Sequence, residues 1–557
     1  MGDTPTLRNT LHKQRAKPKP KERFTQVLII ILAFVAFFVF LLPNAKASED
    51  LGMVQVFEPD EAALFPTIVN MARPKNDIVT FFKQFIVYER YNKGFPFYGP
   101  SALILVFLRW IGQEKNIPLT FLVLRQVISV LPMLCGLLLI VWMQDRFRTY
   151  RSILIFLFLL IVPATIQNGF WWHTDGLTLL LSVLVIWFLY KDALKFGKYF
   201  IGAAATCGVL TAAKMMGVFF FLTISVVLIW GLLEKKITLQ KMVVLGLEFL
   251  GIMSAAFLIS SPFLLSEWGR AGYLNMIRAQ MASLSAGYGV IYAKGLPAAW
   301  PLMRDYFGSA TFLLLSLAVN VYGLTSKKHR FLNTLLLTWF VPLTLYVTIF
   351  SHFKFQYWLP VALPLFSCWA QVLPDNIKGF TVKNWYAVMQ IVLMLVFVAQ
   401  LLSFSVKSAQ LFTARIHRAE NNPNIAFRET VAETLAPVAT IPLRVYYDYR
   451  LYVPETPSWV LSTAYEPISY TQINENDYDL LLLAKQRILD YLNPEVEGVD
   501  EALFAESQRF YRDVEKGEVQ SFVLLGSDEV GLIFIRQDLC EQYYPQANCD
   551  ELLPEVD

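Results

Sequence analysis

Residues 27–42 read VLIIILAFVAFFVFLL, an apolar run close to the ~20 residues that a helix needs to cross a bilayer. The basic stretch RNTLHKQRAKPKPKER (8–23) precedes this run, and positively charged flanks favour the cytoplasmic side of a membrane. We therefore expect residues 1–24 to form a basic cytoplasmic tail and the first helix to leave the membrane near residue 43. Ala45-Lys46-Ala47 also fits a signal-peptidase site, but a retained first helix agrees better with the loops that follow.

The composition of the whole chain agrees with repeated membrane crossings. Of its 557 residues, 55% are hydrophobic and only 17% are charged, whereas about 25% of residues are charged in soluble domains. The positive residues behind the formal net charge of +4 gather in short loops. Such loops report the orientation of the helices and do not indicate a nucleic-acid partner. The composition predicts an integral, polytopic α-helical membrane protein.

Short loops rich in Lys and Arg set the predicted topology. They are QDRFRTYR (144–151), KDALKFGK (191–198), EKKITLQK (234–241), SKKHR (326–330) and PDNIKGFTVKNW (374–385). Placing all of them in the cytoplasm gives about eleven helices within residues 25–405. They are expected near 27–42, 119–143, 152–166, 177–190, 199–213, 216–233, 241–260, 308–325, 331–350, 357–373 and 385–405. Because residues 101–112 are too few for a span, residues 44–118 form one long external loop.

The tail, residues 406–557, is then external and long enough to form a small domain. The segments LRVYYDYRLYV (443–453) and VGLIFIR (530–536) have the pattern of strands. YDLLLLAKQRILDYL (478–492) reads as a mixed element, and a helix is expected near 499–516. We predict a small α/β fold. Cys540 and Cys549 lie in this tail, and an external location predicts a disulfide between them.

Ionisable residues gather at the external face of this topology. Such residues are costly at membrane depth, so they usually face a cavity and have a partner. Each has an ordinary alternative: the acids can solvate a loop, tryptophans can form an interfacial belt, and lysines can extend to the headgroups. Their joint placement favours a site in which a carboxylate base lies beside a lipid-anchored phosphate. The residues concerned are Asp60, Glu61, Lys93, Arg125, His173, Asp175, Lys214, His352 and Lys354.

Six short motifs follow one another along the chain. The long external loop contains FEPDEAALFP (57–66) and then NKGFPFYGPSALIL (92–105). LRQVISVL (124–131) opens the second helix, and HTDG (173–176) lies in the next external loop. The later members are LTAAKMMG (210–217) and HFKFQYWLPVALP (352–364).

In this order the motifs resemble those of GT-C superfamily membrane glycosyltransferases. They are most similar to the branch of protein O-mannosyltransferases and bacterial 4-amino-arabinose lipid A transferases. The resemblance covers residues 25–233 well and 330–370 loosely. It implies a GT-C fold and inverting transfer of a hexose or pentose from a polyprenyl-phosphate donor, on the external face of the membrane.

The resemblance also implies roles for individual residues. Asp60 would be the base, and Glu61 and Asp175 would orient the reactants or bind Mg²⁺ or Mn²⁺ together with Asp60. The donor phosphate would contact Lys214 and Arg125 first, with Lys93, His352 and Lys354 as further candidates. The predicted lining of the substrate site is Trp171, Trp172, His173 and Tyr357.

Two other classes of function remain open at this stage. A transporter or flippase of lipid-linked sugars would place polar residues through the bilayer midplane, whereas this chain gathers them at one face. A non-catalytic assembly subunit would tolerate loss of Asp60. The acceptor is left open as a lipid, a glycan or a protein. The absence of an N-x-S/T sequence favours a bacterial inner membrane with a periplasmic site over an endoplasmic reticulum lumen.

Overall fold

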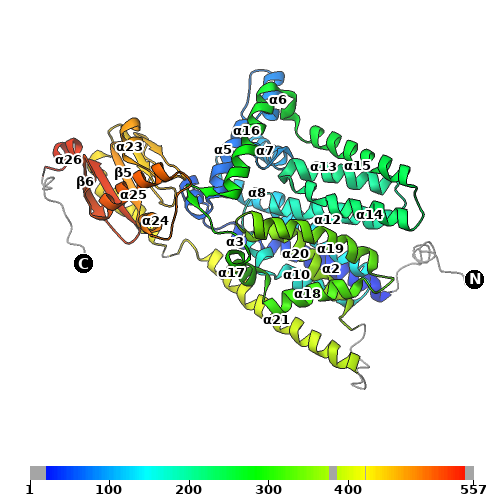
Figure 1. Cartoon of the computed structure of the whole chain (residues 1–557). Coiled ribbons are helices and arrows are strands. Elements are labelled where there is room, and N and C mark those ends of the chain that lie inside the picture. The colour runs from blue at the N-terminus through cyan, green and yellow to red at the C-terminus, as the bar shows by residue number, and fades with distance from the viewer. Residues whose placement is uncertain (1–19, 89, 375–384, 421, 546–557) are drawn as a thin grey trace, which may run out of the picture.

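A computed structural model describes residues 20–88, 90–374, 385–420 and 422–545 of the chain. A large helical body carries a smaller domain built around a sheet, and the long helix α21 (Trp385–Ile416) leads from one to the other (Figure 1). The predicted fold class, a polytopic helical protein with a C-terminal α/β domain, is confirmed. Because α21 continues to Ile416, the polar tail begins later than residue 406.

Six helical segments of the described chain are long and apolar enough to cross a membrane. They are Pro20–Asn44, Ile117–Asp145, Met216–Leu233, Leu239–Ile259 (α15), Arg330–Phe350 and Val388–Ile416 within α21. The first contains α2 (Pro20–Val39) and α3 (Leu41–Asn44), and the second contains α8 (Ile117–Leu124), η2 (Arg125–Val130) and α9 (Leu131–Asp145). The third contains η3 (Met216–Phe220) and α14 (Phe221–Leu233), and the fifth contains α19 (Arg330–Leu345) and η5 (Tyr346–Phe350). A bent pair, α17 (Leu296–Phe307) and α18 (Ala310–Gly323), meets the criteria together with an angle of 83° between its halves.

The remaining predicted spans are helices of shorter or more charged sequence. The segment expected at 152–166 is broken into α10 (Tyr150–Leu160) and α11 (Pro163–Asn168). The segments expected at 177–190, 199–213 and 357–373 are α12 (Asp175–Asp192), α13 (Lys198–Lys214) and α20 (Phe355–Phe366) followed by η6 (Ser367–Gln371). Charged residues lie at both ends of α12, while α13 has 17 residues and α20 has 12, fewer than the ~20 residues of a full span.

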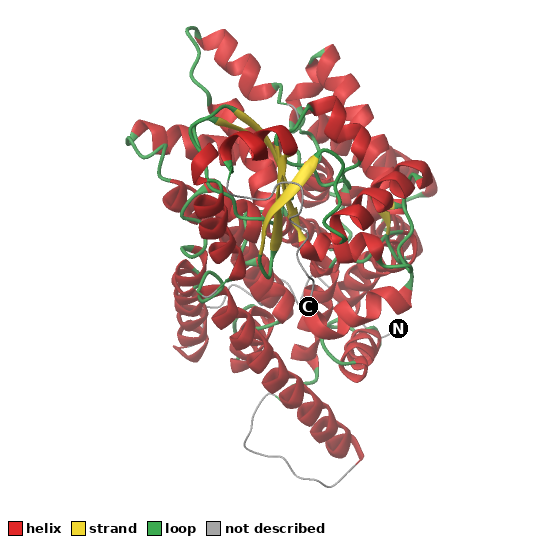
Figure 2. Cartoon of the chain, turned by 90° about the vertical axis from the view of Figure 1, so that its left-hand side faces the viewer, coloured by secondary structure: helices red, strands yellow, loops and turns green. Residues whose placement is uncertain are grey.

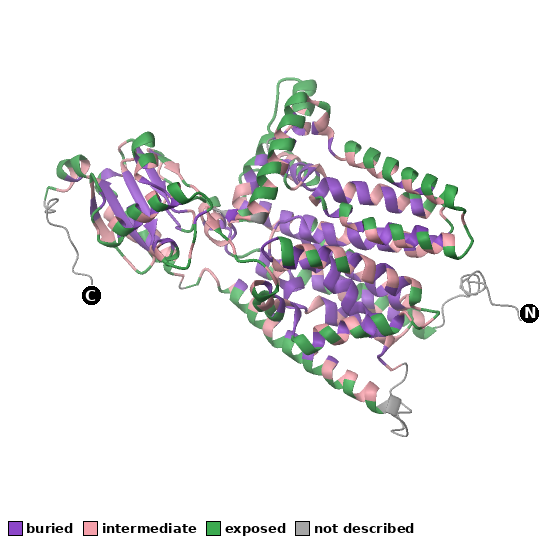
Figure 3. Ribbon diagram, viewed as in Figure 1, coloured by how far each residue is buried: buried purple, intermediate pink, exposed green. Residues whose placement is uncertain are grey.

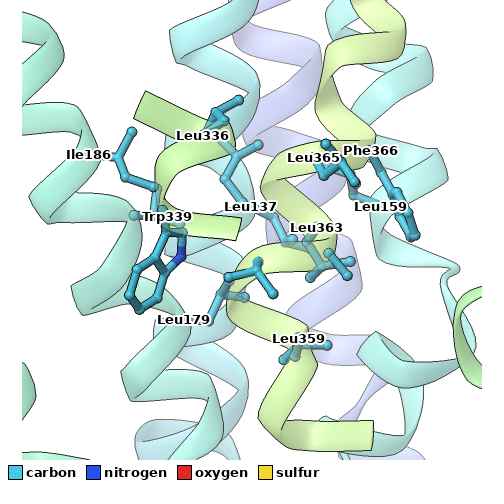
Figure 4. Packing of buried hydrophobic residues seen from close by; sticks show 14 of the residues in the cluster. Leu137, Leu159, Leu179, Ile186, Leu336, Trp339, Leu359, Leu363, Leu365 and Phe366 are labelled. Atoms are coloured by element: carbon cyan, nitrogen blue, oxygen red, sulfur yellow. The ribbon is translucent and has the colours of Figure 1, made fainter. Parts of the chain in front are cut away.

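The helical body has a continuous apolar core. Leu137 of α9, Leu179 of α12 and Trp339 of α19 meet there, beside the leucines of α20 (Figure 4). Lipid tails are as apolar as leucine, so close packing rather than water exclusion must hold these helices together. Gly208 allows α13 to approach α15 closely, because a Cβ there would lie 2.2 Å from the carbonyl oxygen of Met253. Burial is concentrated between the helices (Figure 3).

The long first loop is itself helical. It contains α4 (Leu51–Phe57), α5 (Pro59–Ala72), α6 (Ile78–Ile86) and α7 (Phe95–Trp110). Asp50 and Asp77 cap α4 and α6 by accepting backbone N–H bonds, and Pro59 supplies a preset backbone at the start of α5. These helices share a second apolar core with α16 (Glu267–Ser285), a helix within residues 261–305, the segment between the spans expected near 241–260 and 308–325.

The C-terminal domain is built around a sheet, whose strands are yellow in Figure 2. The sheet has five strands in the order β4-β3-β5-β7-β6. The strands are β3 (Leu443–Tyr447), β4 (Trp459–Ser462), β5 (Leu480–Ala484), β6 (Phe522–Ser527) and β7 (Gly531–Arg536). The first three are parallel, whereas β7 is antiparallel to β5 and to β6. The strands near 443 and 530, the mixed element near 478 and the helix near 499 lie where the sequence predicts them.

Helices cover both faces of this sheet. On one face α22 (Pro423–Thr434) and α26 (Gln537–Tyr543) share a core with alternate strand residues. On the other face lie α23 (Tyr470–Asn476), α24 (Lys485–Leu492) and α25 (Glu501–Glu515). The period-two alternation of the strands supplies an apolar side chain to each face in turn. Cys540 is disulfide-bonded, and Cys549, its predicted partner, lies outside the described residues.

The domain is attached to the first loop by direct contacts. The hydroxyl of Tyr447 donates to Gln55 at 3.0 Å, and that of Tyr465 donates to the carbonyl of Pro59 at 3.1 Å. A small hairpin, β1 (Gly287–Tyr288) and β2 (Val290–Ile291), adds a second attachment, because Ile291 donates its N–H to the carbonyl of Glu497 at 2.8 Å. The sheet domain therefore lies over the start of α5, where the acidic residues are.

Candidate functional site

Three carboxylates sit at the start of α5, and each has a different environment. Glu58 lies at the break between α4 and α5, is buried, and forms ion pairs with Arg415 and, at 2.6 Å, with Arg418. Arg415 lies in the last turn of α21 and Arg418 lies two residues beyond its end, so these ion pairs connect the last long helix to the acidic segment. Glu58 is thereby neutralised and held in the protein interior.

Glu61 is likewise held in an ion pair. It accepts the Nε–H of Arg125 at 2.9 Å and an Nη2–H at 2.6 Å, and it also accepts the backbone N–H of Trp172. Neither charged side chain is exposed, and Arg125 donates another bond to the carbonyl of Asn44 at 2.8 Å. Arg125 begins a π-helical turn, η2, a distortion that often marks functional positions.

Asp60 is the exception among the three acids. It is exposed, and none of the described residues forms a hydrogen bond or an ion pair with it. Its charge acts on Lys93 and on Tyr465, so it lies between the helical body and the C-terminal domain. Of the carboxylates in FEPDE, Asp60 alone is available to a substrate.

A second cluster forms around Asp175, the first residue of α12. One carboxylate oxygen contacts the Nζ of Lys214, and the other contacts the Nδ1 of His173. The Nε2 of His173 in turn lies 2.5 Å from the Nζ of Lys93. Ser129 anchors the histidine, because its hydroxyl accepts the N–H of His173 at 3.0 Å. The structure therefore brings Lys93 and Lys214 to His173 and Asp175, although these residues come from three separate segments of the chain.

Glycine makes the contact between these segments possible. Gly94 follows Lys93 with a φ of +67°, and a Cβ there would lie 1.8 Å from the carbonyl oxygen of Ala212. Only glycine tolerates both the left-handed backbone and this close approach. The first loop can therefore rest against α13, two residues before Lys214.

The protonation states of the cluster follow from its burial and its charges. Burial, together with the neighbouring Lys214 and Lys354, lowers the pKa of Lys93 to about 8, against the opposing effect of Asp175 and Asp60. Burial also lowers the pKa of His173, so the imidazole is neutral at pH 7. A neutral His173 donates Nδ1–H to Asp175 and accepts at Nε2 from the Lys93 ammonium.

The electrostatic balance of the cluster favours an anion. Among the described residues, Lys93, Lys214 and Lys354 meet here, and Asp175 and Asp60 are the carboxylates whose charges act on Lys93. The lysine ammonium groups therefore exceed the carboxylates by one charge. Lysine acts as a point charge toward phosphate, so this cluster suits one phosphate group.

Aromatic rings flank the cluster on one side. Trp171 stacks on the His173 ring, with centroids 4.8 Å apart, and on Phe355 at 6.3 Å. Tyr357 lies beneath the Lys214 ammonium at 4.4 Å. Trp172, by contrast, is fully buried, stacks on Phe97 and donates its indole N–H to Ser101. Trp172 therefore belongs to the core of the first loop, whereas Trp171 borders the site.

His352 sits at the edge of the same region. It is buried against Tyr292, with ring centroids 4.8 Å apart. Burial, with the charges of Lys354 and Lys294, lowers the pKa of His352 to about 4, so the ring is neutral at pH 7. A neutral imidazole lacks the charge that would favour direct phosphate binding.

The carboxylates do not fit a shared divalent metal. The oxygens of Glu61 are directed to Arg125, and those of Asp175 are directed to His173 and Lys214. No group of three His, Cys, Asp or Glu residues in the described chain could hold a metal ion. The predicted Mg²⁺ or Mn²⁺ dependence stays a prediction.

Sequence reasoning overlooked three residues at this site. Arg415 and Arg418 lie in the region that was assigned to the tail, and Tyr465 had no distinguishing pattern. Two arginines three residues apart at the end of an apolar helix were the available signal, because buried charges require partners.

No protein-family model matches the chain, and no curated protein sequence matches it. The chain is similar to two solved structures of ArnT from Cupriavidus metallidurans, one bound to undecaprenyl phosphate and one in the apo state. Each match has 14% sequence identity and a TM-score of 0.51, and it covers 91% of this chain and 97% of that chain. This likeness confirms the predicted GT-C fold.

Proposed function

We propose that this GT-C chain is a membrane glycosyltransferase that moves a sugar from a polyprenyl-phosphate donor to an acceptor hydroxyl. The observation that carries the proposal is the environment of the FEPDE acids. Arginines neutralise Glu58 and Glu61, while Asp60 is exposed, unpaired among the described residues, and electrostatically coupled to the Lys93 cluster. One of the two ArnT structures is bound to undecaprenyl phosphate, which supports a lipid phosphate as the carrier of the donor sugar.

In the proposed reaction Asp60 is the general base. Its carboxylate accepts the proton of the acceptor hydroxyl while the acceptor oxygen attacks the anomeric carbon. The bond between that carbon and the phosphate oxygen breaks, and both of its electrons leave with the polyprenyl phosphate. Attack from the face opposite the phosphate inverts the anomeric configuration.

The lysine cluster stabilises the departing phosphate. Lys214 and Lys93 supply positive charge where negative charge develops on the leaving oxygen, and Lys354 adds to the local potential. Asp175 and His173 orient these ammonium groups, because each bonds directly to one of them. Arg125 and Glu61 act as positioning residues that fix α5 against the second span.

We further propose that the site faces the periplasm of a bacterial inner membrane. The basic loops of the sequence support this orientation, since they would lie in the cytoplasm. Trp171 and Tyr357 would line the sugar site, and the start of α5 would receive the acceptor.

The proposal is tested with purified protein, radiolabelled polyprenyl-phospho-sugars and membrane extracts as acceptor. Asp60→Asn should reduce transfer by at least about 10²-fold, the lower range for general-base catalysis. Glu267→Gln removes an exposed carboxylate elsewhere and serves as the matched control. Full transfer by folded Asp60→Asn would refute the proposed base and favour an assembly subunit. Movement of the intact donor lipid across proteoliposomes without transfer would instead identify a flippase.

A further inference from the structure

A separate pocket lies at the far end of α5. It has a volume of about 290 Å³ and lies between the second half of α5, the segment that follows it, and the end of α6. Its polar lining includes Asn70, Arg73, Lys75, Gln84, Tyr88 and Arg90. None of these residues belongs to the lysine cluster described above.

Among the described residues that line this pocket, the charged side chains are all positive. They are Arg73, Lys75 and Arg90, and none of the three forms an ion pair with another described residue. Three unpaired cations around one small cavity repel each other, and an anion between them removes that repulsion. Arginine in particular binds phosphate through two parallel hydrogen bonds.

A buried hydroxyl gives independent evidence for a ligand. The side chain of Tyr88 is 3% exposed and lines the pocket, yet its hydroxyl has no hydrogen-bond partner among the described residues. Buried polar groups are rarely left unpaired, and an exception calls for a missing partner. A phosphate oxygen in the pocket would provide the acceptor for this hydroxyl.

The pocket is close enough to Asp60 to serve the same substrate. Asp60 and the pocket residues Pro66 and Asn70 share helix α5, and at 1.5 Å per residue they are separated by roughly 9–15 Å along its axis. The charges of Asp60 and Arg90 both act on Tyr465, which contacts Pro59. A phosphorylated saccharide or glycolipid headgroup has the length to reach from one to the other.

We propose that this pocket binds a phosphate group of the acceptor substrate, at a site distinct from the donor-phosphate site at Lys93 and Lys214. Its identification as an acceptor site rests on the proposed glycosyltransferase function. Binding of phosphate by the pocket does not. The substrate class is thereby narrowed to acceptors that carry a phosphate besides the reacting hydroxyl.

Binding is measured first, by calorimetry on the full-length protein in detergent with inorganic phosphate as the probe. Lys214→Gln removes the competing site, and Arg73→Gln/Arg90→Gln is introduced in that background. We expect the pocket variant to lower phosphate affinity by about tenfold or more, whereas Lys83→Gln, an exposed lysine of α6 outside the pocket, leaves it unchanged. Equal affinity in the pocket variant, or an equal loss with Lys83→Gln, would overturn the proposal.

A second arm identifies the source of the phosphate. The same variants are reconstituted in phosphatidylcholine nanodiscs with or without phosphatidic acid. Given the expected loss of inorganic-phosphate affinity, a parallel loss of phosphatidic-acid binding would assign the pocket to a lipid headgroup, whereas unchanged phosphatidic-acid binding would assign it to a soluble phosphorylated acceptor. Either result supports a phosphate site.

A transfer assay then tests the acceptor role. Arg73→Gln/Arg90→Gln should raise the KM for a phosphorylated acceptor and leave the KM for the donor unchanged. A raised donor KM alone would overturn the acceptor role. Absence of transfer by the unmodified protein would defeat the proposed function while leaving the binding results intact, so the two failures are distinguishable.

Discussion

Replacing Glu61 by glutamine should destabilise the protein much more than replacing its neighbour Asp60. Glutamine keeps the volume of Glu61 but removes the charge that compensates Arg125, and both side chains are 0% exposed. One amide oxygen cannot serve the Nε–H, the Nη2–H and the N–H of Trp172, and the amide NH₂ would face the guanidinium.

The expected cost is that of breaking a buried ion pair, about 3–5 kcal/mol. Proteins are stable by about 5–15 kcal/mol, so this loss would remove a large share of the margin. If about 3 kcal/mol of the lost stability lowers the activation free energy of unfolding, the half-life of the folded state shortens by roughly two orders of magnitude. Asp60→Asn should change stability by no more than about 0.5 kcal/mol, since Asp60 is exposed and unpaired among the described residues.

The measurement is the half-life of folded protein at a fixed temperature in detergent, followed by fluorescence-detected size exclusion. A rate is appropriate because membrane proteins of this size commonly unfold irreversibly. A cycle with Arg125→Met and the double variant isolates the pair, and the double variant should cost less than the sum of the two single variants. Equal half-lives for Glu61→Gln and Asp60→Asn, or strict additivity in the cycle, would refute the assignment of Glu61 to a structural pair.

Three further outcomes are expected. Affinity for a donor phosphate should fall as the pH rises through about 8, because Lys93 loses its proton there, whereas Lys93→Arg should keep the affinity at pH 9; a flat profile would contradict this role. Tyr465→Phe removes the hydrogen bond to Pro59, and we expect a stability loss of about 0.5–1.5 kcal/mol with a smaller effect on transfer than Asp60→Asn, measured by denaturation and initial rates. Gly208→Ala should destabilise the helical body by about 1–3 kcal/mol. Gly251→Ala in α15 is the control, because a Cβ there meets nothing within 4 Å, and it should be neutral or slightly stabilising. Equal effects of the two substitutions in thermal unfolding assays would show that close packing of α13 on α15 does not stabilise the protein.

The fold class was accessible from the sequence because it depends on local patterns. The apolar run at 27–42 and the later apolar segments indicate which helices can be surrounded by lipid. The strand pattern near 443 and 530 indicates a sheet that is covered on both faces. Helices such as α12 and α20 resemble a full span less well, because α12 carries charged residues at both ends and α20 has only 12 residues. The helix within 261–305 was missed because its sequence is only weakly apolar.

The acidic segment shows what local sequence patterns cannot predict. The sequence by itself determined that Glu58, Asp60 and Glu61 lie together after the first membrane helix, and family resemblance predicted Asp60 as the base. Which acid is available depends on arginines hundreds of residues away in the chain for Glu58, and 64 residues away for Glu61. Whether a carboxylate is available depends on its burial and on its ion-pair partner, and the neighbouring residues in the sequence determine neither. Only the tertiary structure therefore decided that Glu58 and Glu61 are neutralised while Asp60 stays exposed.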